Sequence, residues 1–249
     1  MMLTRISIIG FLAMTGCTTV ETVKQDSLKI GTEIQERLGI YLYKIGPMTG
    51  TPQMTVFIHG AGGTAESFAG LFSPGKNQIF LFPNLPYVDS YMTQHGETGY
   101  LAWPRDPRLP PNLETVIGRS LALESKFIEK VVTKLGKEYK TRSKINIVGF
   151  SQGGAQAYNF ACRVGGKAGL LVLWASPVHN LTLGLYPDKS TKILVLHNQD
   201  DESVPQADER PFYDLLKEKG YTLSLDLTGI GGHFPTENHR STLLAHLKG

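Results

Sequence analysis

The stretch INIVGFSQGG, residues 145–154, decides the fold of this chain. Residues 145–149 are apolar enough for a buried strand, and residues 153–163 continue as a helix. Between them, the segment Gly149-Phe150-Ser151-Gln152-Gly153 fits the pattern GxSxG, in which a serine stands on a sharp turn from strand to helix. The glycines let the crowded backbone pass, so that the hydroxyl of Ser151 is exposed. The stretch therefore predicts a nucleophilic serine at the carboxyl end of a strand. The competing interpretation is an ordinary serine at a helix start, and the partners described below decide between the two.

Strand-like and helix-like stretches alternate on both sides of this motif. Besides those above, we expect strands at 40–45, 54–59, 78–82, 170–174, 192–197 and 221–227, and helices at 112–136, 208–219 and 236–247. The helix over 112–136 has the clearest 3.6-residue apolar period, and we expect it to end at Gly136. Residues 83–111 contain several prolines and no period, which indicates a loop wall or a small lid. The alternation predicts an α/β fold: a mostly parallel central sheet with helices on both faces and no large lid domain.

The composition excludes several other classes of function. The chain has 249 residues, 41% of them hydrophobic, and a formal net charge of +3. This length suits one α/β domain, and its scattered basic residues leave no nucleic-acid footprint. The two cysteines, Cys17 and Cys162, cannot make a disulfide framework, and no CxxC or HExxH cluster is present. We therefore expect no nucleic-acid partner and no metal or organic cofactor.

The first residues of the chain are typical of an export signal. Arg5 precedes the apolar run 6–14, which is too short to cross a bilayer that needs roughly 20 residues. The sequence Met14-Thr15-Gly16-Cys17 resembles the lipobox of bacterial lipoproteins, although Met14 stands where leucine is more frequent. This resemblance implies cleavage before Cys17 and a lipid on that cysteine.

Three segments follow from that interpretation. We expect a signal peptide at 1–16, a polar tether at 17–29 and a catalytic domain at 30–249. The protein would be exported and anchored to a membrane through Cys17, on the periplasmic or cell-surface side. The alternative is a secreted or cytosolic chain in which this cysteine is incidental.

A nucleophilic serine needs a base, and the base needs an acid that orients it. In a strand-turn-helix context the acid follows the serine and the histidine comes last. The acidic cluster Asp200-Asp201-Glu202 follows the strand at 192–197, and His233 lies in a glycine-rich loop after the strand at 221–227. Asp201 is the preferred acid, with Asp200 and Glu202 as alternatives. His233 is the preferred base, with His239 in the last helix as its alternative.

An acyl-transfer intermediate also needs two backbone amides that stabilise its oxyanion. One amide is expected from the residue after the nucleophile, Gln152, and one from the loop after an earlier strand. The glycine-rich loop 59–63 offers Ala61 as that second donor. No Lys-Ser/Thr pair follows this loop, so a nucleotide site is not indicated. His59 and His197 each end a strand, and we expect them to support the site through hydrogen bonds.

Together these motifs resemble the α/β-hydrolase superfamily and, within it, the phospholipase/carboxylesterase family that includes acyl-protein thioesterases. Residues 149–154 match the nucleophile motif of that family, and residues 197–205 look like its acid loop H-G-x-x-D-x-x-V-P, with Asn198 in place of the glycine. The similarity covers roughly residues 55–247. It implies the α/β-hydrolase fold, with Asp201 as the catalytic acid. Residues 59–62 are similar to the family's H-G-x-G loop, which implies the amides of Ala61 and Gln152 as oxyanion donors.

We therefore predict a serine carboxylic-ester hydrolase of the carboxylesterase, lysophospholipase or thioesterase type. Its triad would be Ser151, Asp201 and His233, and its substrate a small-molecule or lipid acyl ester or thioester. Two alternatives stay open. A serine peptidase of the same fold usually carries a gating domain, for which this length leaves no room, and a non-catalytic lipid-anchored surface protein has no need of a complete triad. The acyl length, the leaving group and the oligomeric state do not follow from the sequence.

Overall fold

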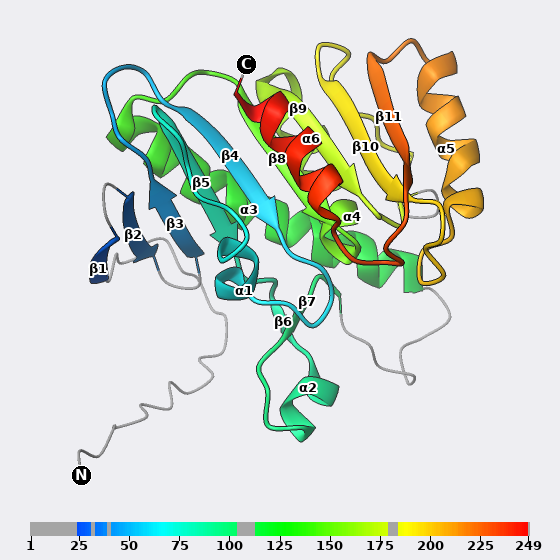
Figure 1. Ribbon diagram of the computed structural model, residues 1–249, viewed down its shortest axis with the longest axis horizontal. Coiled ribbons are helices and arrows are strands. Elements are labelled where there is room, and N and C mark those ends of the chain that lie inside the picture. Colours follow the sequence, from blue (N-terminus) through cyan, green and yellow to red (C-terminus); the bar gives the residue numbers. More distant parts are fainter. Residues whose placement is uncertain (1–23, 31–32, 39–40, 104–112, 179–183, 249) are drawn as a thin grey trace.

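A nine-stranded sheet in the order β1-β2-β3-β5-β4-β8-β9-β10-β11 forms the centre of the molecule (Figure 1). The computed structural model describes residues 24–30, 33–38, 41–103, 113–178 and 184–248. The strands are β1 (Lys24–Ile30), β2 (Glu33–Leu38), β3 (Tyr41–Ile45), β4 (Gln53–Ile58), β5 (Gln78–Pro83), β6 (Tyr87–Val88), β7 (Tyr100–Leu101), β8 (Ile145–Phe150), β9 (Ala168–Trp174), β10 (Lys192–Asn198) and β11 (Leu223–Gly229). The α-helices are α1 (Ala65–Ala69), α2 (Ser90–Gln94), α3 (Leu113–Tyr139), α4 (Gln152–Val164), α5 (Gln206–Glu218) and α6 (Glu237–Leu247).

Most of the sheet is parallel. The pairings that run from β5 through β4, β8, β9 and β10 to β11 are all parallel. At the other side, β1, β2 and β3 reach β5 through antiparallel pairings. Parallel strands are buried on both faces and are therefore almost continuously apolar, as in QIFLFP of β5 and AGLLVLW of β9. The prediction of a mostly parallel sheet is confirmed.

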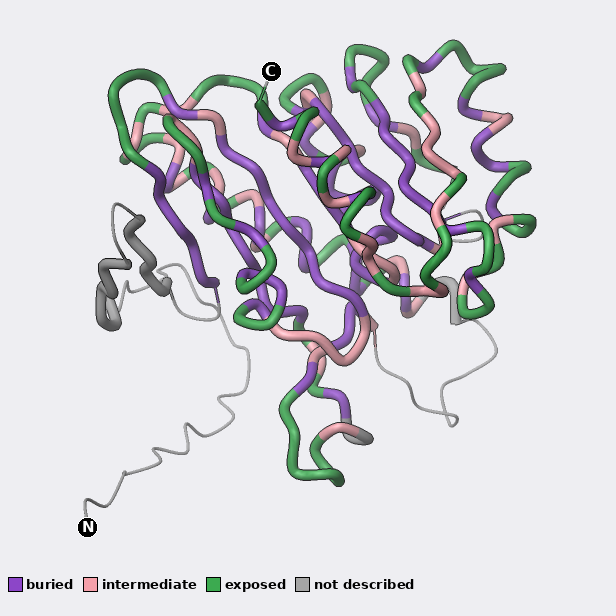
Figure 2. The backbone as a smooth tube through the Cα atoms, viewed as in Figure 1, coloured by how far each residue is buried: buried purple, intermediate pink, exposed green. Residues whose placement is uncertain are grey.

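Helices cover both faces of this sheet, so that alternate residues of one strand enter two different cores. In β4, Val56 and Ile58 pack with residues of α3, α4 and α5, whereas Phe57 packs with residues of α1 and α6. In Figure 1, α1 and α6 lie in front of the sheet and α3 and α4 behind it. Buried residues run along the central strands (Figure 2). The two layers confirm the predicted placement of helices on both faces.

The proline-rich region after β5 forms a small hairpin and not a separate domain. The hairpin of β6 and β7, with α2 between its strands, extends beyond the carboxyl ends of the parallel strands (Figure 1). Tyr100 of β7 connects it to the glycine-rich loop after β4, because its carbonyl accepts from the amide of Gly62 at 3.0 Å. Residues 104–112 lie outside the described part of the chain. No large lid is present among the residues described.

Helix α3 is longer than the sequence predicts. Gly136 was expected to end it, but the helix continues to Tyr139 and ends where Lys140 adopts a φ of 51°. The amide of Thr141 then donates to the carbonyl of Gly136 at 3.1 Å, as in a Schellman motif. The left-handed position is thus occupied by Lys140, and Gly136 serves as the acceptor one turn earlier.

The predicted tether is also partly wrong. Residues 24–30, which were assigned almost entirely to the tether 17–29, form strand β1 and pair with β2. A strand at the edge of a sheet needs only backbone hydrogen bonds to one neighbour, so its composition can be polar and lack an apolar run. The predicted signal peptide at 1–16 and Cys17 lie outside the described residues. Within the ranges that are described, no helix has the length and apolar character to span a membrane.

Candidate active site

Ser151 stands on the turn between β8 and α4 with φ 51° and ψ −126°, a strained conformation for a residue with a Cβ atom. Its amide donates to the carbonyl of Trp174 at 2.8 Å, which ties the turn to β9. Its side chain makes no capping hydrogen bond to α4. The turn requires glycine at position 153, because a Cβ there would lie 2.3 Å from the carbonyl oxygen of His59. The strained turn therefore leaves the Ser151 hydroxyl available to a base.

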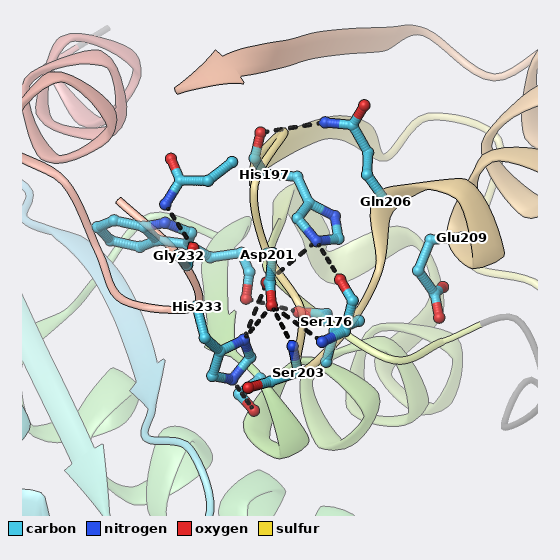
Figure 3. Close-up of polar contacts among 12 residues, drawn as sticks. Ser176, His197, Asp201, Ser203, Gln206, Glu209, Gly232 and His233 are labelled. Carbon is cyan, nitrogen blue, oxygen red and sulfur yellow. Dashed lines mark hydrogen bonds and ion pairs between the residues drawn. The ribbon is translucent and has the colours of Figure 1, made fainter. Parts of the chain in front are cut away.

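His233 lies between Ser151 and Asp201, and Figure 3 shows its ring beside the Asp201 carboxylate. Its Nε2 is 2.8 Å from the Ser151 Oγ, and its Nδ1 is 2.9 Å from the Asp201 Oδ2. The side chain of Asp201 is completely buried, whereas that of His233 is 18% exposed. When Nδ1–H donates to the carboxylate, Nε2 is the nitrogen that can accept the serine proton. The structure thus brings the three predicted residues together from loops at the ends of β8, β10 and β11.

The buried carboxylate of Asp201 has several further partners. The amides of Ser203 and Val204 each donate to its Oδ1 at 2.9 Å. His197 Nε2 lies 3.2 Å from its Oδ2 and 2.7 Å from the carbonyl oxygen of Val204. His197 Nδ1 lies 3.2 Å from the hydroxyl of Tyr213. Burying a carboxylate is costly unless its lone pairs are satisfied, and these partners also give Asp201 one orientation. The expected supporting role of His197 is confirmed at the level of its contacts.

The neighbouring acids lie elsewhere. The Asp200 carboxylate accepts hydrogen bonds from the amides of Gly231 at 3.0 Å and Gly232 at 3.1 Å. The hydrogen bond from Gly231 is the main reason why the pKa of Asp200 is lowered. Glu202 is exposed. Asp200 therefore holds the loop that carries the histidine, while its neighbour Asp201 contacts the imidazole itself.

Asn198, the last residue of β10, holds the same loop from the other side, a role that the sequence motifs do not predict. Its Nδ2 donates to the carbonyl of Gly232 at 2.9 Å and to the carbonyl of Phe234 at 3.0 Å. These two residues flank His233 in the chain. The side chain of Asn198 thus fixes the backbone on both sides of the imidazole. Its position in the acid-loop motif, where it replaces glycine, was the available signal.

His239, the alternative base, is not brought to Ser151. It is buried in α6, with its ring 6.2 Å from that of Trp174 and its Nε2 3.7 Å from Asp226 Oδ1. Burial lowers its pKa. His239 therefore belongs to the packing between α6 and the sheet.

The glycine-rich loop after β4 lies directly against the nucleophile. A Cβ at Gly60 would lie 3.1 Å from the Ser151 Cβ and 2.9 Å from the Phe150 ring, so only glycine fits here. His59 holds the loop: its Nδ1 lies 2.7 Å from the carbonyl oxygen of Gly60, and its Nε2 accepts from the amide of Leu85 at 3.3 Å. Burial lowers the pKa of His59 to about 4. His59 is therefore neutral near pH 7 and serves as a fixed support, as expected.

The two predicted amide donors remain unused by the protein itself. Among the described residues, neither the amide of Ala61 nor that of Gln152, the first residue of α4, donates a hydrogen bond to another group. The Gln152 side chain has a second role, since its Oε1 accepts from the amide of Ala102 at 2.7 Å. It thereby ties the segment after β7 to the serine turn. The described part of the chain contains no cluster of His, Cys, Asp and Glu that could hold a metal ion.

A serine on a strained strand-to-helix turn, with acid and histidine at later strand ends, defines the class of α/β-hydrolases. Three solved structures share this fold. Esterase PE8 aligns with a TM-score of 0.64 at 20% identity, covering 80% of this chain and 93% of its own. The Bacillus cereus carboxylesterase aligns with a TM-score of 0.62 at 15% identity, covering 84% and 94%. The Zea mays acyl-protein thioesterase 2 aligns with a TM-score of 0.61 at 16% identity, covering 84% and 97%.

The sequence itself identifies the family. Residues 46–233 match the family described as Phospholipase/Carboxylesterase, and the chain belongs to that family. No curated protein matches the sequence significantly. The matched region includes the serine turn and the acid loop, and it ends at His233 itself.

Proposed function

We propose that this protein is a serine carboxylic-ester hydrolase that acts through an acyl-enzyme. One observation carries the proposal: His233 is within 2.8 Å of the Ser151 hydroxyl and within 2.9 Å of a fully buried carboxylate. An imidazole held in this way can accept a proton at Nε2 and be stabilised as imidazolium by Asp201.

In the first half-reaction, Ser151 Oγ attacks the acyl carbonyl carbon while its proton moves to His233 Nε2. The carbonyl oxygen becomes an oxyanion, which accepts hydrogen bonds from the amides of Ala61 and Gln152. The carbon–oxygen or carbon–sulfur bond to the leaving group then breaks, and the leaving group takes the proton from His233. In the second half-reaction, water gives a proton to His233 and attacks the acyl-enzyme, which releases the acid and restores Ser151.

The surroundings of the imidazole suit an apolar acyl group. The Phe150 ring lies 5.2 Å from the His233 ring, and the Phe234 ring lies 6.3 Å from it. Phe234 and Ile230, on the same loop, are each 73% exposed. Large exposed apolar side chains beside a catalytic group offer surface that an acyl chain can cover. A short or medium acyl ester or thioester is the substrate class that we propose.

The largest effect is expected from Ser151→Ala, which removes the nucleophile. The kcat for a p-nitrophenyl ester should fall by on the order of 10⁴-fold or more, because only binding and the oxyanion donors remain. Ser73→Ala, an exposed serine outside the site, is the matched control and should leave kcat unchanged.

Two further readouts separate the alternatives. Labelling of Ser151 by a fluorophosphonate, together with ester turnover, supports the proposal. Labelling with turnover of peptide amides and not of esters would instead indicate a peptidase. Absence of both labelling and turnover would indicate a non-catalytic protein with a hydrolase fold.

We further propose that the protein is exported and lipidated on Cys17. The support is the apolar run 6–14 that ends in the lipobox-like Met14-Thr15-Gly16-Cys17. One acyl chain anchors a protein only marginally, whereas several chains on a lipoprotein cysteine hold it firmly. Cys17→Ser should release the protein from the membrane fraction or block its processing. Mass spectrometry of the mature N-terminus is the test, and an unmodified N-terminus at another residue would contradict lipidation.

A further inference from the structure

A cavity of about 530 Å³ lies at the amino-terminal edge of the sheet, opposite to the candidate active site. Its wall includes Asn146 at the start of β8, Gly169 at the start of β9 and Lys192 at the start of β10. Leu247, the last residue of α6, closes one side. In Figure 1 this end of α6 lies beside the ends of the strands that point away from the triad. A volume of this size is within the range of small-molecule sites.

The charged side chains that line this cavity are all cationic in the part of the chain that the structure describes. Five cationic side chains line it: Lys76, Arg142, Lys144, Lys192 and Lys248. Among the described residues, no carboxylate lines the cavity, and none of these five cations forms an ion pair. Asp188 lies nearby but is engaged by the amide of Ser190, and this hydrogen bond, with a smaller contribution from Lys144, lowers its pKa.

Neutral hydrogen-bonding groups complete the wall. The Lys144 ammonium donates to the Ser190 hydroxyl at 3.1 Å, which positions both groups at the cavity. A hydroxyl that accepts from an ammonium can still donate its own proton to an anion. The Gln53 side chain donates to the carbonyl of Lys144 at 2.8 Å and thereby fixes the backbone of that lysine. The cavity is therefore a partly ordered set of donors, and not only a group of flexible lysines.

Like charges gathered around one cavity repel each other, and a bound anion removes that repulsion. One phosphate group carries about 1.5 to 2 negative charges near pH 7, so two such groups supply roughly 3 to 4. That charge approaches the five positive charges of the wall. Carboxylates carry less charge per group, and a single small ion cannot contact side chains on all sides of this volume.

We propose that this cavity binds an anion that carries at least two phosphate groups. The site is separate from the triad, so the proposal does not depend on the proposed function. The source of these phosphate groups is either a free phosphoanion or neighbouring lipid headgroups, and we favour the free anion because the cations line a cavity instead of lying on a flat surface. Binding should weaken as ionic strength rises, since the side chains of these cations are exposed and screened by salt.

The test is calorimetric titration of the full chain with inorganic pyrophosphate at low ionic strength. The double variant Lys144→Gln/Lys192→Gln should weaken binding about tenfold, because it removes two of the five positive charges that line the cavity. The control is Lys126→Gln/Lys137→Gln, which removes the same charge from exposed positions of α3 outside the cavity and should change binding less than about twofold.

Other outcomes overturn the proposal. Absence of binding by the unmodified protein at millimolar pyrophosphate would do so, as would equal loss in both double variants. Sedimentation with vesicles of phosphatidylglycerol and phosphatidylcholine distinguishes the source of the phosphate. Binding to these vesicles without binding of pyrophosphate, lost in Lys144→Gln/Lys192→Gln, would overturn the free anion in favour of a lipid headgroup. Because calorimetry needs no turnover, its failure is independent of any failure to hydrolyse esters.

Discussion

Charged side chains at the two edges of the central sheet differ in how their charge is compensated. At the carboxyl-terminal edge, the Asp201 carboxylate is completely buried and contacts two imidazoles and two backbone amides. At the amino-terminal edge, five exposed cations line one cavity without an ion pair among the described residues. The Asp201 carboxylate is satisfied by groups of the protein itself, whereas the five cations need a bound anion to compensate their charge.

The difference reflects the separate requirements of a charge that takes part in catalysis and a charge that binds a ligand. A catalytic charge must have its orientation before the substrate arrives, because reorganisation during the reaction raises the barrier. A binding charge can instead be neutralised by the ligand itself, provided that water and salt screen it beforehand. Substitutions at the first edge should therefore change rates strongly, while those at the second should change affinities modestly.

After loss of Ser151 itself, the largest effect should come from Asp201→Asn. Asparagine keeps the shape but cannot stabilise the imidazolium or select the same tautomer, so kcat should fall on the order of 10³ to 10⁴-fold. Asp200→Asn is the matched control. It keeps an oxygen that accepts from Gly231 or Gly232, and its loss in kcat should be much smaller. If Asp200→Asn were the more damaged enzyme in the same ester assay, the assignment of the acid would be wrong.

An intermediate effect is expected for His59, whose pKa burial lowers to about 4. Between pH 6.5 and 4, His59 binds a proton in the unfolded chain, whereas the buried His59 of the folded chain stays neutral. The contribution of His59 to the free energy of unfolding should thus fall as pH falls through this window, by up to about 3 kcal/mol. His59→Gln should remove this contribution from the pH dependence that urea unfolding experiments measure. His246→Gln, which changes an exposed histidine at the opposite edge, should retain it.

The smallest of the three effects should come from Asn198→Ala, which frees the backbone on both sides of His233. We expect kcat to fall about 10- to 100-fold with little change in KM, because a small misplacement of a catalytic group affects the transition state more than binding. Gln199→Ala is the control. That neighbouring amide reaches the carbonyl of Thr228, at 3.5 Å, and not the histidine loop. Equal losses in both variants would remove Asn198 from the role of a positioning residue.

Local pattern was sufficient where the signal lay within a short stretch of chain. The apolar run before Gly149 and the helical stretch after Gly153 predict the serine turn, because strand, turn and helix follow one another directly. Sequence pattern gave the wrong prediction at two places. Residues of the expected tether form β1, because their backbone pairs with that of β2. Helix α3 continues past Gly136, because Lys140 takes the left-handed position that ends it. Propensity states what a residue favours, and tertiary context decides which of two neighbours takes the strained place.

The sequence by itself determined the α/β class, the serine turn and the identity of the glycine-rich loop. The class follows from the periodicity of the apolar residues, and the two glycine-containing segments follow from the close backbone approach that only glycine allows. It left three adjacent acids and two histidines as candidates, and only their residue-by-residue similarity to a family pattern favoured Asp201. The tertiary structure decided the geometry, because successive residues of a loop point in different directions. Asp201 faces His233 from a buried position, while Asp200 faces the amides of Gly231 and Gly232. It also decided what no local pattern contains: cations that are far apart in the chain meet at one cavity because the parallel strands of the sheet begin at the same edge.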